Sequence, residues 1–132
     1  MEGWDIHKEV CKEKDEKINY VEFAARDLTA TKAFFSEVFG WSFQAFGPEY
    51  IAFSNAGLEG GFYQADLSSV SAKGGALIVL FSERLEETLS KVEKAGGEIV
   101  KPIFEFPGGR RFHFTEPSGN ELAVWSSKES DK

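Results

Sequence analysis

Arg111 and His113 are the two residues whose types and spacing most strongly suggest chemistry in this sequence. They alternate with Phe112 and Phe114 within Arg110–Thr115, and successive side chains of a strand point to opposite faces. If the two aromatic rings pack beneath a helix, the two basic side chains face the other way. An imidazole exchanges protons near neutral pH, and a guanidinium binds a carboxylate or phosphate through its planar fork. The segment therefore makes His113 a candidate catalytic acid or base and Arg111 a candidate anion-binding group.

Both residues also have structural explanations. A single histidine in a folded region is commonly a core residue with satisfied hydrogen bonds. Arg111 can instead form an ion pair, for which the candidate partners are Glu22, Glu49 and Glu121. The pattern alone thus leaves a ligand site and a structural ion-pair network open.

The elements that would position these residues occur twice along the chain. Ile18–Ala25 alternates as a strand covered on one side, and Asp27 is a predicted N-cap for an amphipathic helix that ends at Gly40. Short segments separated by turn residues then predict three strands, at Trp41–Phe46, Tyr50–Phe53 and Glu59–Gln64. The first half therefore has the order β-α-β-β-β.

The second half repeats this order. Ala76–Phe81 is a predicted strand, and the apolar stripe of a helix follows it and ends at Gly97. In both predicted helices a closing glycine lies 12 positions after the first leucine, and Leu85 lies 57 residues after Leu28. Three more strands are predicted at Glu98–Pro102, Arg110–Thr115 and Glu121–Ser126, with turns at 107–109 and 116–120.

Together the halves predict an α+β domain at 18–127, with βαβββ modules at about 18–66 and 75–127. Residues 1–17 are densely charged and are predicted to form a flexible tail, and 128–132 form a short C-terminal tail. Asp5, His7 and Cys11 lie in the first tail. Since little apolar surface anchors this segment, we expect no metal or nucleophile site there.

The composition limits the classes of partner. The 132-residue chain carries a net charge of −7, so its field repels nucleic acid and anionic lipid surfaces. It has one cysteine, no secretory signal and no apolar run of about 20 residues. We therefore expect a cytoplasmic protein that binds neither nucleic acid nor membrane.

Four short motifs carry a resemblance to a known superfamily. Asp-Leu precedes the first helix, Phe-Gly-Trp closes it, Ala-Gly-Gly closes the second helix, and Glu-Pro-Ser-Gly-Asn precedes the last strand. In this order, the stretch from Ile18 to Ser126 resembles the glyoxalase, bleomycin-resistance and dioxygenase (vicinal oxygen chelate) superfamily. The resemblance implies a cup-shaped mixed sheet with helices on the outside, a homodimer, and a ligand held in the cup.

Metal-dependent members of this superfamily place His, Glu or Gln on the first and last strand of each module. By the resemblance, these positions are occupied here by Tyr20, Gly61, Leu77 and Ala123. Such side chains offer one phenol oxygen at most, whereas a divalent ion needs several N, O or S donors. We therefore expect no metal at the usual positions and no other cofactor.

The same register suggests which residues line the cup. Glu22 and Glu121 share a strand face with the metal positions, and either can orient His113. Tyr63 and Trp125 occupy matched positions and can form aromatic walls, although core or dimer packing explains them equally well. The predicted ligand pocket consists of Tyr20, Glu22, Tyr63, Arg111, His113, Glu121 and Trp125.

These expectations favour a metal-free protein that binds a small organic molecule, with His113 and Glu22 as the best candidates for any catalysis. One alternative is an enzyme, a lactoylglutathione-lyase-like lyase or isomerase. It would hold a divalent cation through displaced ligands, namely His113 and the carboxylates Glu22, Glu59 and Glu121. A third possibility is a structural or partner-binding dimer without a ligand.

Overall fold

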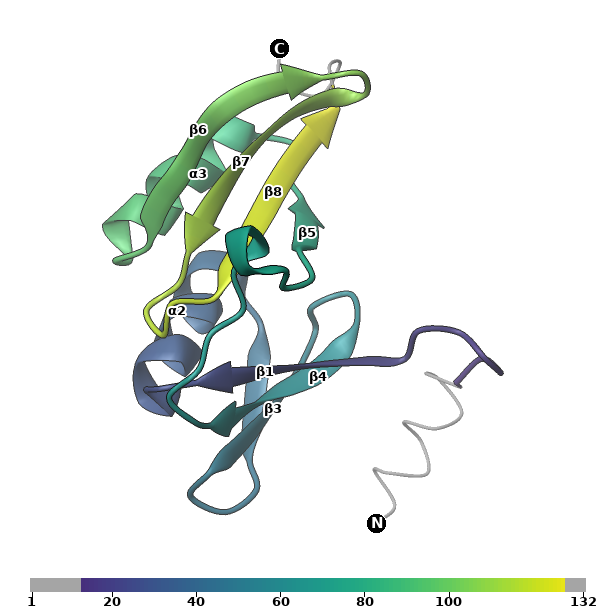
Figure 1. Ribbon diagram of the computed structural model, residues 1–132, viewed down its shortest axis with the longest axis vertical. Coiled ribbons are helices and arrows are strands. Elements are labelled where there is room, and N and C mark those ends of the chain that lie inside the picture. Colours follow the sequence, from purple (N-terminus) through teal and green to yellow (C-terminus); the bar gives the residue numbers. More distant parts are fainter. Residues whose placement is uncertain (1–12, 128–132) are drawn as a thin grey trace.

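Both halves of the chain form a strand, a helix and three further strands in the computed structural model, which describes residues 13–127 (Figure 1). The first half contains β1 (Tyr20–Ala25), α2 (Leu28–Phe39), β2 (Ser42–Ala45), β3 (Tyr50–Ser54) and β4 (Glu59–Gln64). A 3₁₀ turn, η1 (Ser71–Lys73), precedes β5 (Ile78–Phe81), α3 (Leu85–Lys94), β6 (Glu98–Phe106), β7 (Gly109–Thr115) and β8 (Glu121–Ser127). The predicted βαβββ order is therefore confirmed. The predictions for residues 1–12, which include Asp5, His7 and Cys11, and for 128–132 lie outside the described residues.

Each module builds its own mixed four-stranded sheet. The strand orders are β1-β4-β3-β2 and β5-β8-β7-β6. β1 runs parallel to β4, β5 runs parallel to β8, and the other neighbours are antiparallel. The α+β class and the two-module architecture are thus confirmed. Within residues 13–127 no helix has the length and apolar character needed to cross a membrane.

The ends of α2 are fixed by local sequence. The side chain of Asp27 accepts a hydrogen bond from the amide of Ala30 at 3.0 Å, which satisfies one of the free N–H groups of the first turn. Gly40 has a φ of 73°, a left-handed conformation that glycine adopts without strain. Both predicted boundaries of this helix are confirmed.

An aromatic core lies between the helices and the two sheets. α2 packs on β2, β3 and β4, and α3 packs on β6, β7 and β8. The ring of Phe34 in α2 lies 5.8 Å from the ring of Phe114 in β7, so one core joins the two modules. Burying a phenylalanine contributes about 1.5–3 kcal/mol. This core therefore decides which face of β7 is turned toward the helices.

A buried polar cluster also joins the modules. Glu116, in the turn before β8, accepts hydrogen bonds from the Thr31 hydroxyl of α2 at 2.7 Å and from the Asn120 side chain at 2.8 Å. Asn120 also donates to the Ala24 carbonyl of β1 at 2.8 Å, and the hydroxyl of Ser118 bonds that of Thr31 at 2.7 Å. We call Thr31, Glu116, Ser118 and Asn120 the inter-module clamp. The predicted turn at 116–120 is thus also a contact between modules.

β6 extends further than the sequence predicts. It continues past Pro102 to Phe106, because Pro102 lies on an edge strand where the pairing with β7 is irregular, and there a missing N–H is tolerated. The turn predicted at 107–109 is shorter, since Gly109 begins β7. A Cβ at Gly109 would overlap the carbonyl of Ser126, so the close approach of β8 requires glycine. The longer strand places Phe104 and Phe106 beside β7.

Candidate functional site

Arg111 and His113 lie on the face of β7 that points away from the helices. Phe112 and Phe114, on the opposite face, are fully buried in the core. Figure 1 shows α3 behind this sheet and η1 in front of β8. The two basic side chains therefore occupy the side of the sheet that α3 does not cover.

Glu121 holds His113 in place from the neighbouring strand. Nδ1 of His113 lies 2.8 Å from Oε2 of Glu121, and the two residues are only 2% and 6% exposed. Glu121 also accepts hydrogen bonds from the amide and the hydroxyl of Ser71, each at 2.9 Å. Burial alone would raise the pKa of Glu121, but the hydrogen bonds from His113 and Ser71 outweigh it and hold that pKa below its usual value.

The free nitrogen of His113 follows from this contact. An ionised Glu121 can only accept hydrogen bonds, so Nδ1 of His113 carries a hydrogen. The second ring nitrogen, Nε2, is buried and has no hydrogen-bond partner among residues 13–127. A group held in one orientation with one free nitrogen is what proton transfer requires. Glu121 is therefore the orienting carboxylate, since Glu22 is bonded to another residue.

Arg111 carries a second buried nitrogen without a partner. Its Nε makes no hydrogen bond within the described part of the chain, and its guanidinium lies over the rings of Phe104 and Phe106, 5.4 and 5.6 Å from their centroids. The guanidinium forms no ion pair with Glu22, Glu49 or Glu121, so the structural alternative considered for it is not realised within residues 13–127. A buried N–H without a partner costs about 1–3 kcal/mol.

The preceding arginine shows a different arrangement. Arg110 points to the opposite face of β7 and donates to both carboxylate oxygens of Glu86, at 2.7 and 3.1 Å. Such two-point pairs satisfy the planar fork of the guanidinium. The chain therefore provides a carboxylate for Arg110 and none, among the described residues, for Arg111.

Aromatic rings surround Arg111 and His113. The ring of Trp125 in β8 lies 5.1 Å from that of Phe81 and 6.3 Å from that of Phe106. The ring of Phe104 lies 5.9 Å from that of His113. We call the set Phe81, Phe104, Phe106, Arg111, His113, Glu121 and Trp125 the β7 face.

Three residues of these clusters are missing from the predicted pocket. Phe104 and Phe106 fall outside the predicted pocket because the predicted strand ends at Pro102. Their alternation with Glu105 is a signal that the strand continues. Phe81 lies on a predicted strand, but the alternation does not indicate that its ring meets Trp125. The contacts of the β7 face thus depend on strand pairing more than on local pattern.

Tyr50 is the centre of a second polar group, on β1 and β3. Its hydroxyl donates to Oε2 of Glu22 at 2.9 Å and lies 2.5 Å from the hydroxyl of Tyr20. Burial, followed by the hydrogen bonds with Tyr20 and Glu22, raises the pKa of Tyr50 well above its usual value. Tyr63 is 39% exposed and is paired with Tyr50 across β3 and β4.

The predicted pocket residues thus fall into two groups. Arg111, His113, Glu121 and Trp125 lie on the second sheet, and Tyr20, Glu22 and Tyr63 lie on the first. No hydrogen bond, ion pair or ring contact among the described residues connects the two groups.

The four positions implied for a metal do not fit one. Strand register pairs Glu22 with Gly61 and Val79 with Ala123, so Gly61 and Ala123 are equivalent in the two modules. A Cβ at Gly61 would overlap the hydroxyl and ring of Tyr50, which leaves no room for a donor side chain. Leu77 and Ala123 have no donor atoms. Residues 13–127 contain no other group of three or more His, Cys, Asp or Glu arranged to hold an ion.

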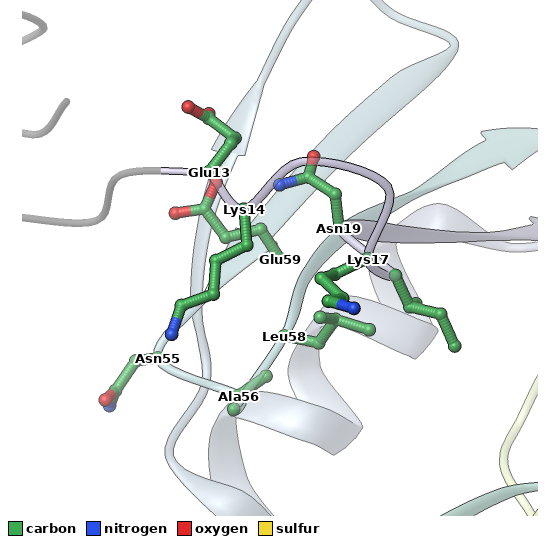
Figure 2. A pocket seen from close by; sticks show the side chains of 10 residues that line it. Glu13, Lys14, Lys17, Asn19, Asn55, Ala56, Leu58 and Glu59 are labelled. Carbon is green, nitrogen blue, oxygen red and sulfur yellow. The ribbon is translucent and has the colours of Figure 1, made fainter.

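Two cavities lie beside other parts of the structure, and the second shares Phe81 with the β7 face. One, of about 460 Å³, lies between the segment before β1, with Glu13, Lys14 and Lys17, and the turn at 55–58 (Figure 2). Its walls carry exposed charged side chains and no buried polar group without a partner. The other, of about 560 Å³, lies between β1, β5 and the same turn and is mainly apolar, with Leu77 in its wall. Neither contains Arg111 or His113.

Comparison with known proteins agrees with this architecture. The sequence profile of the Glyoxalase/Bleomycin resistance protein/Dioxygenase superfamily matches residues 17–124. No curated protein matches the sequence. Because the profile match covers most of the chain, it shows the family.

Similar solved structures extend the comparison to the fold. A glyoxalase-related enzyme from Fulvimarina pelagi has a TM-score of 0.70 and 19% identity, with 85% of this chain and 88% of that chain covered. A lactoylglutathione lyase from Agrobacterium tumefaciens has a TM-score of 0.65 and 18% identity, with 88% and 97% covered. The fosfomycin resistance protein FosX from Listeria monocytogenes has a TM-score of 0.70 and 18% identity, with 86% and 95% covered. On the profile match and this fold, the chain belongs to the glyoxalase/bleomycin resistance protein/dioxygenase superfamily.

Proposed function

We propose that this chain binds a small organic molecule on the β7 face, without a metal at the usual positions of its superfamily. The observation that carries the proposal is the pair of buried atoms, Arg111 Nε and His113 Nε2, that have no partner. A ligand that displaces the side chains covering these two atoms and bonds to both would remove a cost of about 1–3 kcal/mol at each. The neighbouring rings offer the flat apolar surface that small-molecule sites commonly use.

The groups that would meet the ligand are already fixed. Glu121 and Ser71 set the orientation of His113, and Phe104 and Phe106 lie beneath the guanidinium of Arg111. Because these side chains are already held in place, ligand binding costs less conformational entropy here than on a surface whose side chains must first become ordered.

Acid–base catalysis is the second candidate, and the buried pair of His113 and Glu121 favours it. In this version His113 Nε2 accepts a proton from the bound molecule and returns it, as a glyoxalase-type lyase or isomerase would require. One of the similar structures is a lactoylglutathione lyase. A version in which Glu22, Glu121 and His113 hold a divalent cation is less well supported. Glu22 already bonds Tyr50, and Glu121 already bonds His113.

Turnover assays separate these versions. Isomerisation of a glutathione hemithioacetal that persists with a chelator and is lost in His113→Gln would support metal-free catalysis. Turnover that is abolished by the chelator would support the displaced-metal version. No turnover by the folded wild-type protein would exclude lactoylglutathione-lyase-like activity and leave the binding proposal.

We also propose that the chain forms a homodimer. β1 and β5 are edge strands, each with one neighbour, and both line the apolar crevice between the modules. Val79 and Phe81 on β5 are 42% and 52% exposed. Unpaired edges and exposed apolar side chains are what a second copy would cover.

The binding proposal is tested by nuclear magnetic resonance with a set of small neutral, cationic and anionic aromatic compounds. We expect saturable shifts at Arg111 Nε, the His113 ring and the Trp125 indole for at least one compound. Shifts confined to the cavity beside Lys14 or the crevice between β1 and β5 would contradict the proposal, as would no shift with any compound.

A further inference from the structure

The charge that Arg111 presents has no counterpart in the described part of the chain. Its guanidinium rests on Phe104 and Phe106, and its Nε is buried without an acceptor. The only carboxylate of the β7 face, Glu121, accepts from His113 at 2.8 Å and from Ser71 at 2.9 Å. Arg111 therefore lacks an anionic hydrogen-bond acceptor. A carboxylate on a ligand matches the guanidinium in both charge and geometry.

The number of charges on the ligand follows from the surroundings. One guanidinium without a partner balances one negative charge. Glu121 is ionised on the same face, with its pKa held below the usual value by the hydrogen bonds that outweigh burial. The whole chain carries a net charge of −7. A second negative charge on the ligand would be repelled by Glu121 and by the net charge of the chain, so a monoanion fits better than a phosphate dianion.

The rings define the rest of the ligand. Trp125 and Phe81 form an edge-to-face pair at 5.1 Å, and Phe106 lies on the other side of Trp125 at 6.3 Å. Trp125 is directly opposite Arg111 in the pairing of β7 with β8. A flat ring packed against Trp125 would therefore lie beside the guanidinium.

We infer that the β7 face binds an aromatic carboxylate, whose carboxylate group bonds Arg111 and whose ring packs against Trp125 and Phe106. This inference rests on the proposed small-molecule function and assigns it a ligand class. The buried Nε2 of His113, at the adjacent position on the same face, is available to a further polar group of the same ligand.

Phenylacetate, phenylacetamide and phenyl phosphate are matched probes for this inference. They share a phenyl ring and differ in the group that would meet Arg111: a monoanion, a neutral isostere and a phosphate. We expect titrations followed at the Arg111 Nε–H and Trp125 indole signals to give the tightest binding for phenylacetate. Phenylacetamide should bind about tenfold or more weakly, because it cannot provide a charge-assisted acceptor.

Arg110 provides the matched control, since it lies one residue away on the opposite face and is bonded to Glu86. Arg111→Gln should weaken phenylacetate binding about tenfold or more and leave phenylacetamide unchanged. Arg111→Lys should recover only part of the affinity, because it keeps the charge and loses the fork. Arg110→Gln should bind phenylacetate like the wild type. Thermal unfolding of each variant verifies that it is folded.

The outcomes distinguish this inference from the proposed function. Equal affinity for phenylacetamide and phenylacetate would overturn the carboxylate assignment and leave small-molecule binding in place. Tighter binding of phenyl phosphate than of phenylacetate would overturn the assignment of a monoanionic ligand. The three probes could also leave the signals of Arg111, His113 and Trp125 unchanged while other small compounds shift them. That result would refute the aromatic-carboxylate inference and leave the proposed function in place. No binding by any compound would refute both.

Discussion

Glu121 connects the buried histidine to stability in acid. Because the pKa of Glu121 is lowered in the folded chain, its carboxylate contributes stability above the ordinary glutamate value of 4.5, and this contribution is lost as the pH falls through the lower folded value. Glu121→Gln should lower the unfolding free energy by about 1–3 kcal/mol at neutral pH. The difference from the wild type should shrink as the pH falls below 4.5. Urea unfolding across this range measures it.

Glu93, an exposed carboxylate on α3, provides the control for this measurement. Glu93→Gln should change the unfolding free energy by no more than about 0.5 kcal/mol. A deficit in Glu121→Gln that stays constant as the pH falls below 4.5 would mean that the hydrogen bonds of Glu121 do not favour its ionised form.

Tyr50 should resist ionisation in the folded chain. Burial and the hydrogen bonds with Tyr20 and Glu22 raise its pKa, so the neutral phenol contributes stability below the ordinary value of 10.0, and this is lost as the pH rises toward the raised value. At about pH 11 the folded wild type and Tyr50→Phe should show equal tyrosinate absorbance. After unfolding in urea, the wild type should show one more tyrosinate. An extra tyrosinate already in the folded wild type would contradict the raised pKa.

Single residues differ in how far the sequence could predict their roles. Alternation along β7 suffices to place Arg111 and His113 on one face, because strand periodicity is local. The sequence indicates two candidate partners for His113, Glu22 and Glu121, and the pairing of β7 with β8 places Glu121 beside the histidine. Tyr50 was missed, because its hydroxyl reaches Glu22 across two strand pairs and no local pattern contains that contact.

Among the elements, the inter-module clamp sets how strongly the halves depend on each other. Asn120→Ala removes the donor to the Ala24 carbonyl and to Glu116, and leaves buried groups without partners. We expect a loss on the order of 3 kcal/mol in unfolding free energy. Asn19→Ala, at an exposed position before β1, should change it little. Urea unfolding measures both, and equal effects would show that the clamp is not a stabilising contact.

The boundaries of α2 were predictable, whereas the ends of α3 and β6 differ from the predicted ones: α3 ends at Lys94 and not at Gly97. Asp27 and Gly40 fix the ends of α2 through contacts within one turn. β6 was predicted too short because proline usually ends a strand, and only the position of β6 at the sheet edge allows Pro102 to be accommodated. The position of β6 at the edge of the sheet depends on the tertiary structure, so the local sequence does not reveal it.

For the whole molecule, the proposed homodimer predicts a solution mass of twice the 14.7 kDa chain. Val79→Glu should shift the protein toward the monomer, because it places a charge on an edge proposed to be covered. Val100 is a matched control, since it is 45% exposed and lies on β6, the opposite edge of the same sheet. Sedimentation at micromolar concentration measures the mass. A monomeric wild type, or dissociation by Val100→Glu alone, would contradict this interface.

The absence of suitable metal ligands predicts how the whole chain responds to divalent cations. A ligand of the folded state at 100 times its Kd adds about 2.7 kcal/mol to stability. We therefore expect no thermal stabilisation by Mg²⁺, Mn²⁺, Ni²⁺ or Zn²⁺. Elemental analysis of the purified protein should show no stoichiometric metal. A stabilising shift that is lost in Glu22→Gln or Glu121→Gln would favour the displaced-ligand enzyme.

Tyr50 makes a metal ligand at position 61 depend on a second substitution. A glutamate there would need Tyr50 to be replaced first, and that replacement removes the hydrogen-bond partner of Tyr20 and Glu22. A donor at Ala123 would enter a fully buried site, where an unpaired charge is costly. Each single step would lower stability before enough ligands existed to bind an ion. The present side chains therefore oppose the gain of metal ligands at these positions by single substitutions.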